Sequence, residues 1–352
     1  MSTHGKQLFT DITLELYNGC AGSCTGCLLS VAERGQGFPL MSISMFEAVV
    51  NQIATYGKSI DLNYRIVLVF GDVPQLPLDA LHKYIEIVQT AGLSIGMTMT
   101  LTSENYWDVY ESKLVSIINT CPNIVFDITV DPIRLSRNKE YGNRLRKACR
   151  LAPKVHLQML LSEALLSKLG PQDLGKELDM ELEGRSVSLG FTPTIENMGR
   201  KNYGYSVDKA AGWATQFYNS TAAGSALFKD ELRRFNSSGS YEQFIAQTYH
   251  VSSDGKVWPT AYTSFGDVIL DYRNKAPALG DLKSTCLDQI LKSPTVKRLG
   301  IQSYNKLLNS PFSCSECEHF NSCNFNGIGI VRRVYKDVES RLGSCYGPKA
   351  FL

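Results

Sequence analysis

Three cysteines lie close together near the start of this 352-residue chain. Cys20, Cys24 and Cys27 are spaced C-x3-C-x2-C, and Gly22 and Gly26 let the chain turn tightly between them. Thiolates are soft ligands, and three of them converging on one point suit an iron–sulfur cluster. A cubane cluster held by three cysteines has one iron without a protein ligand, where a substrate or cofactor can bind.

A zinc site is the alternative interpretation of this triplet. Structural zinc sites usually add a second cysteine pair or two histidines a dozen or more residues further on. After Cys27, the next cysteine or histidine is His82. The spacing therefore favours an iron–sulfur cluster.

A second group of cysteines lies near the C-terminus. Cys314, Cys317 and Cys323 follow the spacing C-x2-C-x5-C, and Cys345 comes 22 positions later. Four thiols can hold either zinc or an iron–sulfur cluster, and the spacing alone fits both. The remaining cysteines are scattered and share no such pattern: Cys121, Cys149 and Cys286.

Strand and helix patterns alternate between the two cysteine groups. Apolar stretches predict strands over residues 12–17, 65–70, 93–101, 124–130, 155–161 and 186–192. Amphipathic stretches between them predict helices, the first from a capping box at Ser44–Glu47 to Gly57. This alternation predicts a parallel α/β sheet, whose functional residues gather at the carboxyl ends of the strands. The cysteine triplet and the Gly71-Asp72 turn both lie at such ends.

These features together resemble the radical SAM superfamily over about residues 8–200. The resemblance implies a partial (β/α)6 barrel. It also implies a first 4Fe-4S cluster, held by the triplet, whose open iron binds S-adenosylmethionine. One electron from this cluster would cleave the cofactor to a 5′-deoxyadenosyl radical, which abstracts a hydrogen atom from the substrate.

The resemblance also suggests cofactor contacts. The family usually carries Gly-Gly-Glu-Pro after the second strand, whereas this chain has Phe70-Gly71-Asp72-Val73, with Asp72 positioned to face the cofactor's amino group. Gly26 stands where many members carry an aromatic residue. Further expected contacts lie near the mouth of the barrel: Thr129, Asp131, Gln158 and Thr192, with the segment up to Arg200.

The C-terminal region resembles the SPASM/twitch extension of radical SAM enzymes. A hairpin over residues 249–258 with Asp254-Gly255 at its turn, a Leu-Gly-Asp-Leu segment and a helix over 287–300 precede the last cysteines. The resemblance implies one auxiliary 4Fe-4S cluster on Cys314, Cys317, Cys323 and Cys345. Cysteines for a second auxiliary cluster are missing around Pro259 and at Gly327. The expected domains are residues 8–200, a helical linker over 201–245, and the auxiliary-cluster domain over 246–352.

Relatives of this type commonly modify ribosomal peptides, so we expect a ribosomally made peptide or a protein side chain as substrate. A small-molecule oxidoreductase, or a non-catalytic zinc or iron–sulfur protein, are the alternatives. Cys121 and Cys149 are predicted to be packing residues, and either would be a thiol hydrogen donor only if the reaction were an epimerisation. The resemblance implies an electron donor such as flavodoxin or ferredoxin. Peptide-modifying relatives often carry an N-terminal leader-binding domain, and only nineteen residues precede Cys20, so either a separate leader-binding protein delivers the peptide or the substrate is something else.

Composition narrows the class of protein further. The net charge is +2 and no long basic run occurs, which argues against a nucleic-acid partner. No apolar stretch of about twenty residues predicts a membrane span. We therefore expect a cytoplasmic protein, where ten cysteines are metal ligands more often than disulfides. The isolated histidines His82, His156 and His250 are predicted to be structural.

Overall fold

Six parallel strands form the main part of one sheet. The computed structural model describes residues 10–16, 40–69, 73–101, 107–183, 187–193, 207–221, 249–258 and 278–297. Each strand pairs with the next one along the chain: β1 (Thr10–Glu15), β2 (Tyr64–Val69), β3 (Ser94–Met99), β4 (Val125–Val130), β5 (Lys154–Leu161) and β6 (Ser188–Pro193). The predicted parallel α/β fold is confirmed.

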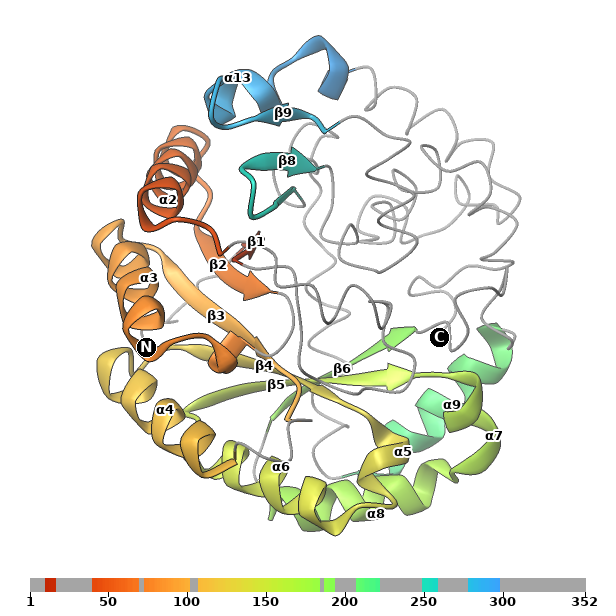
Figure 1. The fold of residues 1–352 in the computed structure, drawn as a ribbon. Coiled ribbons are helices and arrows are strands. Elements are labelled where there is room, and N and C mark those ends of the chain that lie inside the picture. The colour runs from red at the N-terminus through yellow and green to blue at the C-terminus, as the bar shows by residue number, and fades with distance from the viewer. Residues whose placement is uncertain are drawn as a thin grey trace, which may run out of the picture.

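Helices connect the strands and lie along the outer side of the sheet (Figure 1). The longer ones are α2 (Ile43–Ser59), α3 (Leu78–Thr90), α4 (Trp107–Thr120), α6 (Lys139–Leu151) and α8 (Pro171–Leu182). Short helical segments lie between them: η1 (Val73–Gln75), α5 (Pro132–Leu135) and α7 (Glu163–Lys168). Among the described residues, no helix is long and apolar enough to cross a membrane.

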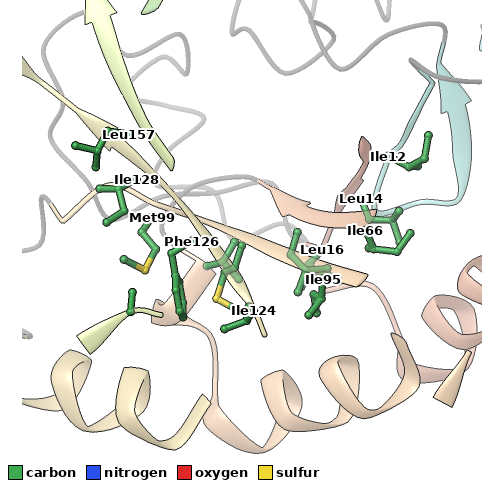
Figure 2. Packing of buried hydrophobic residues seen from close by; sticks show 14 of the residues in the cluster. Ile12, Leu14, Leu16, Ile66, Ile95, Met99, Ile124, Phe126, Ile128 and Leu157 are labelled. Carbon is green, nitrogen blue, oxygen red and sulfur yellow. The ribbon is translucent and has the colours of Figure 1, made fainter. Parts of the chain in front are cut away.

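The core lies between the sheet and these helices. In β1 to β5, alternate residues are apolar and most of them are buried, and Figure 2 shows Leu16, Ile95 and Phe126 between the strands and the helices. Each such side chain contributes roughly 1.5–3 kcal/mol by leaving water. Polar residues such as Thr129 and Gln158 alternate with the buried ones, so they lie on the other, inner face of the sheet.

Helix α2 begins earlier and ends later than the sequence predicts. The cap is Ser42, whose Oγ accepts a hydrogen bond from the backbone N–H of Met45 at 3.2 Å, and Ser44 lies inside the first turn. The helix passes Gly57 and ends at Ser59. Gly57 is required there by packing, because a Cβ would lie 2.7 Å from Cδ2 of Tyr64.

The described part of the C-terminal extension joins the same sheet. β7 (His250–Val251) pairs in parallel with β1, and β8 (Lys256–Trp258) and β9 (Gly280–Asp281) continue in antiparallel order. The predicted hairpin is confirmed, with Gly255 at a φ of +85° in its turn. The helix predicted over 287–300 is interrupted: α13 (Leu287–Leu291) ends before Pro294, which disfavours the helical conformation of the residue before it, and residues 294–297 are helical again.

Two helices anchor the later part of the chain to the barrel. The backbone N–H at the start of α13, that of Leu287, donates to Oε1 of Gln52 in α2 at 2.8 Å. α9 (Val207–Ser220) packs against α8. The indole Nε1 of Trp213 in α9 donates to the carbonyl of Leu169 at 3.0 Å. The region predicted as a helical linker therefore contributes a helix that packs on the barrel's outer layer.

Candidate active site at the carboxyl edge of the sheet

The cysteine triplet belongs to a segment whose two ends are fixed beside β1. The chain leaves the sheet after Leu16, and the backbone N–H of Met41 donates to the carbonyl of Leu16 at 2.7 Å. The buried Tyr84 hydroxyl, from α3, donates to the carbonyl of Met41 at 2.5 Å. Burial raises the pKa of Tyr84 to about 12, so this hydroxyl remains a donor at neutral pH. The segment carrying Cys20–Cys27 therefore starts and ends at the carboxyl edge of the sheet.

The Gly71-Asp72 turn starts beside this segment. Glu15 and Val69, the last residues of β1 and β2, are partners in the strand register. Because the chain continues from them to the cysteine triplet and to Gly71-Asp72, the two motifs leave the sheet from adjacent strands. The two motifs themselves and the C-terminal cysteines Cys314, Cys317, Cys323 and Cys345 lie outside the described residues. Within the described residues, no group of three or more metal-binding side chains occurs.

Two of the expected contacts on later strands are neighbours. Thr129 on β4 and Gln158 on β5 are register partners on the inner face. Oε1 of Gln158 lies 3.0 Å from Nε2 of His156, which gives this histidine the structural partner that the sequence could not show. The backbone of Thr192 pairs with Leu160, one step closer to the carboxyl edge. The strand order thus brings all three expected positions to adjacent strands.

Asp131 has a different role from the one expected. It follows β4 instead of lying within it, and it is only 6% exposed. Its Oδ1 accepts a hydrogen bond from the backbone N–H of Arg134 at 3.1 Å, and so caps the unpredicted helix α5. A proline at the first helical position, Pro132, favours this start. The carboxylate therefore stabilises the turn after β4.

A tyrosine and two arginines form a cluster at the carboxyl end of β4. The Tyr141 hydroxyl donates to the carbonyl of Thr129 at 3.3 Å and accepts from the N–H of Asp131 at 3.2 Å. The guanidinium carbons of Arg134 and Arg144 lie 5.8 and 6.0 Å from the centroid of the Tyr141 ring, within cation–π range. No motif in the sequence marks this cluster, although its three members all follow β4 along the chain.

Arg144 is the unusual member of this cluster. It is only 6% exposed, and its Nε and Nη2 have no hydrogen-bond partner among the described residues. A buried cation without an anion is costly, so this position suits an anionic group of a ligand. A neighbouring arginine on the same helix, Arg146, is instead paired with Glu181 at 2.9 Å.

Charged residues also lie further down the inner face. Arg65 on β2 donates to both carboxylate oxygens of Asp11 on β1, with Nε at 2.7 Å from Oδ1. Asp127 on β4 is near them, and burial raises its pKa to about 7, although the positive charge of Arg65 opposes this rise. This group lies toward the amino ends of the strands, away from the cysteine segment.

The two buried cysteines lie at the opposite end of the strands from the carboxyl edge, too far from it to be thiol donors there. Cys121 follows the last residue of α4, just before β4, and Cys149 lies in the last turn of α6, just before β5. Both positions are at the amino ends of the strands, opposite the carboxyl edge. Burial also raises the pKa of the Cys121 thiol. Both cysteines are buried packing residues, as predicted, and neither is placed to supply hydrogen to a substrate at the carboxyl edge. Cys286 is an exposed surface residue before α13.

Comparisons with known proteins agree with the arrangement of strands. No protein-family model matches the chain, and no curated protein matches it. Native anSMEcpe with bound AdoMet and Kp18Cys peptide aligns with a TM-score of 0.59 at 14% identity, covering 93% of this chain and 95% of that chain. The complex with AdoMet and Cp18Cys peptide aligns with a TM-score of 0.58 at 12% identity, covering 95% and 97%.

A third structure, histidine-tagged anSMEcpe with bound AdoMet, aligns with a TM-score of 0.56 at 13% identity, covering 94% of this chain and 92% of that chain. AnSMEcpe is an anaerobic sulfatase-maturating radical SAM enzyme. At these identities the likeness establishes the fold. The chain has the fold of a radical SAM enzyme, and the predicted partial barrel is confirmed.

Proposed function

We propose that this protein is a radical SAM enzyme, which reductively cleaves AdoMet and abstracts a hydrogen atom from its substrate. The observation that carries the proposal is the position of the C-x3-C-x2-C segment, which leaves the sheet from β1 and is closed at its base by the Leu16–Met41 hydrogen bond. In the matching fold, anSMEcpe binds AdoMet. The shared fold and the three cysteine thiolates together support the proposal that this protein is a cofactor-binding enzyme.

The residues around this edge fit the two groups that the reaction needs. Cys20, Cys24 and Cys27 would hold a 4Fe-4S cluster, since three thiolates leave one iron open for AdoMet. Asp72 would pair with the amino group of the cofactor, and Arg144 would pair with its carboxylate. When bound, these groups supply a 5′-deoxyadenosyl radical.

The protein side chains position and shield this chemistry. Tyr141 supports Arg144 through its ring, and its hydroxyl holds the backbone at the end of β4. Thr129 and Gln158 would border the cofactor from the inner face, with Thr192 beside them. The apolar layer between sheet and helices keeps the strands rigid, so that the edge residues stay aligned.

An auxiliary cluster is part of the proposal. Cys314, Cys317, Cys323 and Cys345 would hold a second 4Fe-4S cluster in a domain that begins near residue 246. With four protein ligands this cluster has no open iron. We infer that it passes electrons or braces the extension.

A peptide or a protein side chain is the substrate class that we propose. The peptides bound in the anSMEcpe structures support it, because this chain covers nearly the whole of that fold. Electrons would come from a donor such as flavodoxin or ferredoxin, and a separate leader-binding protein would deliver the peptide. Reduced thiols and clusters fit the cytoplasm. A small-molecule substrate is the alternative.

Production of 5′-deoxyadenosine tests the proposal. The anaerobic protein, reconstituted with iron and sulfide and reduced with dithionite, should convert AdoMet to 5′-deoxyadenosine. The Cys24→Ala variant should produce none, because two thiolates cannot hold the cluster in its open form. A fully loaded wild-type protein that leaves AdoMet intact would instead be an electron-transfer or structural protein.

A further inference from the structure

A completely buried acid–histidine pair connects the barrel to the extension. Nε2 of His250, on β7, lies 3.2 Å from Oε2 of Glu15 on β1, and both side chains are 0% exposed. Nδ1 of the same histidine lies 2.9 Å from Oγ1 of Thr13. This geometry suits a ring that donates from Nε2 to the carboxylate and accepts the threonine hydroxyl at Nδ1.

The pair strengthens a very short strand contact. Only two residue pairs, Thr13–His250 and Leu14–Val251, connect β1 to β7. Such a short ladder contributes few backbone hydrogen bonds, so the side-chain bonds of His250 form a substantial part of the contact. A buried hydrogen-bonded pair adds little net stability, whereas removing one partner costs the other a hydrogen bond inside the protein. What the pair fixes is therefore the relative position of the two strands.

Glu15 lies at the point where this position matters. It is the last residue of β1. Leu16, the next residue, accepts the hydrogen bond from Met41 that closes the base of the cysteine segment. One side of the β1 end is thus held by the barrel and the other by His250. His250 itself begins the hairpin that leads, through β9 and α13, toward Cys314.

We propose that His250 is a positioning residue that couples docking of the C-terminal extension to AdoMet binding at the first cluster. Through its hydrogen bond to Glu15, it fixes the end of β1 and with it the start of the segment carrying Cys20, Cys24 and Cys27. The inference rests on the proposed function of that segment. An extension that is poorly docked would loosen the cofactor site, even when all its cysteines are intact.

Matched substitutions test the contacts of His250 with Glu15 and with Thr13 separately. His250→Asn places an amide opposite Thr13 but is too short to reach Glu15. His250→Gln places an amide donor where Nε2 lies, and so keeps the bond to Glu15. Thr13→Val removes only the hydroxyl. Ser252→Ala is the control within the hairpin, because the buried Ser252 hydroxyl accepts from Nε1 of Trp258 at 3.0 Å and donates to Oδ1 of Asp254 at 2.5 Å, both partners within the hairpin.

Two measurements on the full-length, cluster-loaded protein test the proposal. The first is hydrogen–deuterium exchange of the peptide containing residues 10–16. The second is the change in the electron paramagnetic resonance spectrum of the reduced protein as AdoMet is added. His250→Asn should speed exchange in this peptide and raise the AdoMet concentration needed for the spectral change about tenfold. His250→Gln, Thr13→Val and Ser252→Ala should stay close to wild type.

The possible results distinguish failure of the His250 coupling from failure of the proposed radical SAM function. If His250→Asn behaves like Ser252→Ala in both measurements, the inference is wrong. Faster exchange with an unchanged AdoMet response would show a structural contact without coupling, and would also overturn it. A wild-type spectrum that never responds to AdoMet would overturn the proposed function itself. Should His250→Asn fail to fold, Glu15→Met removes the acceptor at similar volume, and the same result is expected of it.

Discussion

Arg144 shows how one side chain can indicate a ligand. Its guanidinium is buried against Tyr141, and two of its nitrogens have no partner within the described parts of the chain. If it pairs with the AdoMet carboxylate, Arg144→Gln should weaken AdoMet binding by about 10- to 100-fold, because a charge-assisted hydrogen bond contributes about 1.5–3 kcal/mol. Anaerobic equilibrium dialysis with the cluster-loaded protein measures this directly.

The control for this substitution lies on the same helix. Arg146→Gln removes an arginine that pairs with Glu181 on α8, so AdoMet binding should not change. Decarboxylated AdoMet should bind the wild type and Arg144→Gln equally, since it lacks the group that Arg144 would contact. Equal loss of affinity for both ligands would show that Arg144 supports the site without touching the carboxylate.

Asp127 should make stability depend on pH. Its pKa is raised from 3.8 to about 7 by burial, with Arg65 and Asp11 as the charged groups facing it. A raised carboxyl pKa stabilises the folded state fully below about pH 4, and this contribution is lost as pH rises through 7. Asp127→Asn should therefore be more stable than the wild type at pH 8, on the order of 1–2 kcal/mol, and the difference should shrink toward pH 5.

Thermal unfolding of the anaerobic protein at pH 5.5 and pH 8 checks this expectation. The direction of the change decides the test: Asp127→Asn should raise the unfolding midpoint at pH 8. A lower midpoint at pH 8 would mean that the ionised carboxylate is stabilised by Arg65 more than it is destabilised by burial.

Gly57, near the end of helix α2, packs closely against Tyr64, the first residue of strand β2. A Cβ at this position would lie 2.7 Å from Cδ2 of Tyr64 and 2.9 Å from the carbonyl oxygen of Leu62. Alanine usually stabilises a helix over glycine, but here the overlap should reverse the sign. We expect Gly57→Ala to destabilise the protein by about 1–3 kcal/mol, measured by thermal unfolding.

Gly212 provides the matched comparison. It lies in α9, and among the described residues a Cβ there would meet no atom within 4 Å. Gly212→Ala should therefore stabilise the protein by about 0.5–1 kcal/mol. If both substitutions stabilise, helix propensity outweighs packing at Gly57, and the close approach of Tyr64 relaxes at little cost.

The elements that the sequence predicted well are those with strong local patterns. Apolar residues in short runs or at alternate positions located all six strands to within a few residues, because at least one face of the strands packs against the helices. Helix starts were less certain, since Ser42 and Ser44 are both suitable caps and only the backbone angles decide between them. Helix α5 was missed because four residues carry no periodicity.

At the scale of the whole molecule, the sequence could not reveal which distant segments meet. Glu15 and His250 are 235 positions apart, and neither lies in a motif. Their contact depends on β7 adding to the edge of the barrel sheet beside β1, which no local pattern encodes. Arg144 was missed for a similar reason, because its burial against Tyr141 depends on how α6 packs. The cysteine ligands stay a prediction, which rests on their spacing alone.

Iron and sulfide analysis measures how many clusters the whole chain holds. A first cluster at the triplet and an auxiliary cluster near the C-terminus would together bring about eight irons and eight sulfides per chain after anaerobic reconstitution. Removing Cys317 and Cys323 should halve both numbers without abolishing the AdoMet-dependent spectral change. Four irons with one zinc in the wild type would contradict the auxiliary cluster. If zinc were found, the extension would have a structural role only, supporting the first cluster through the pairing of β7 with β1.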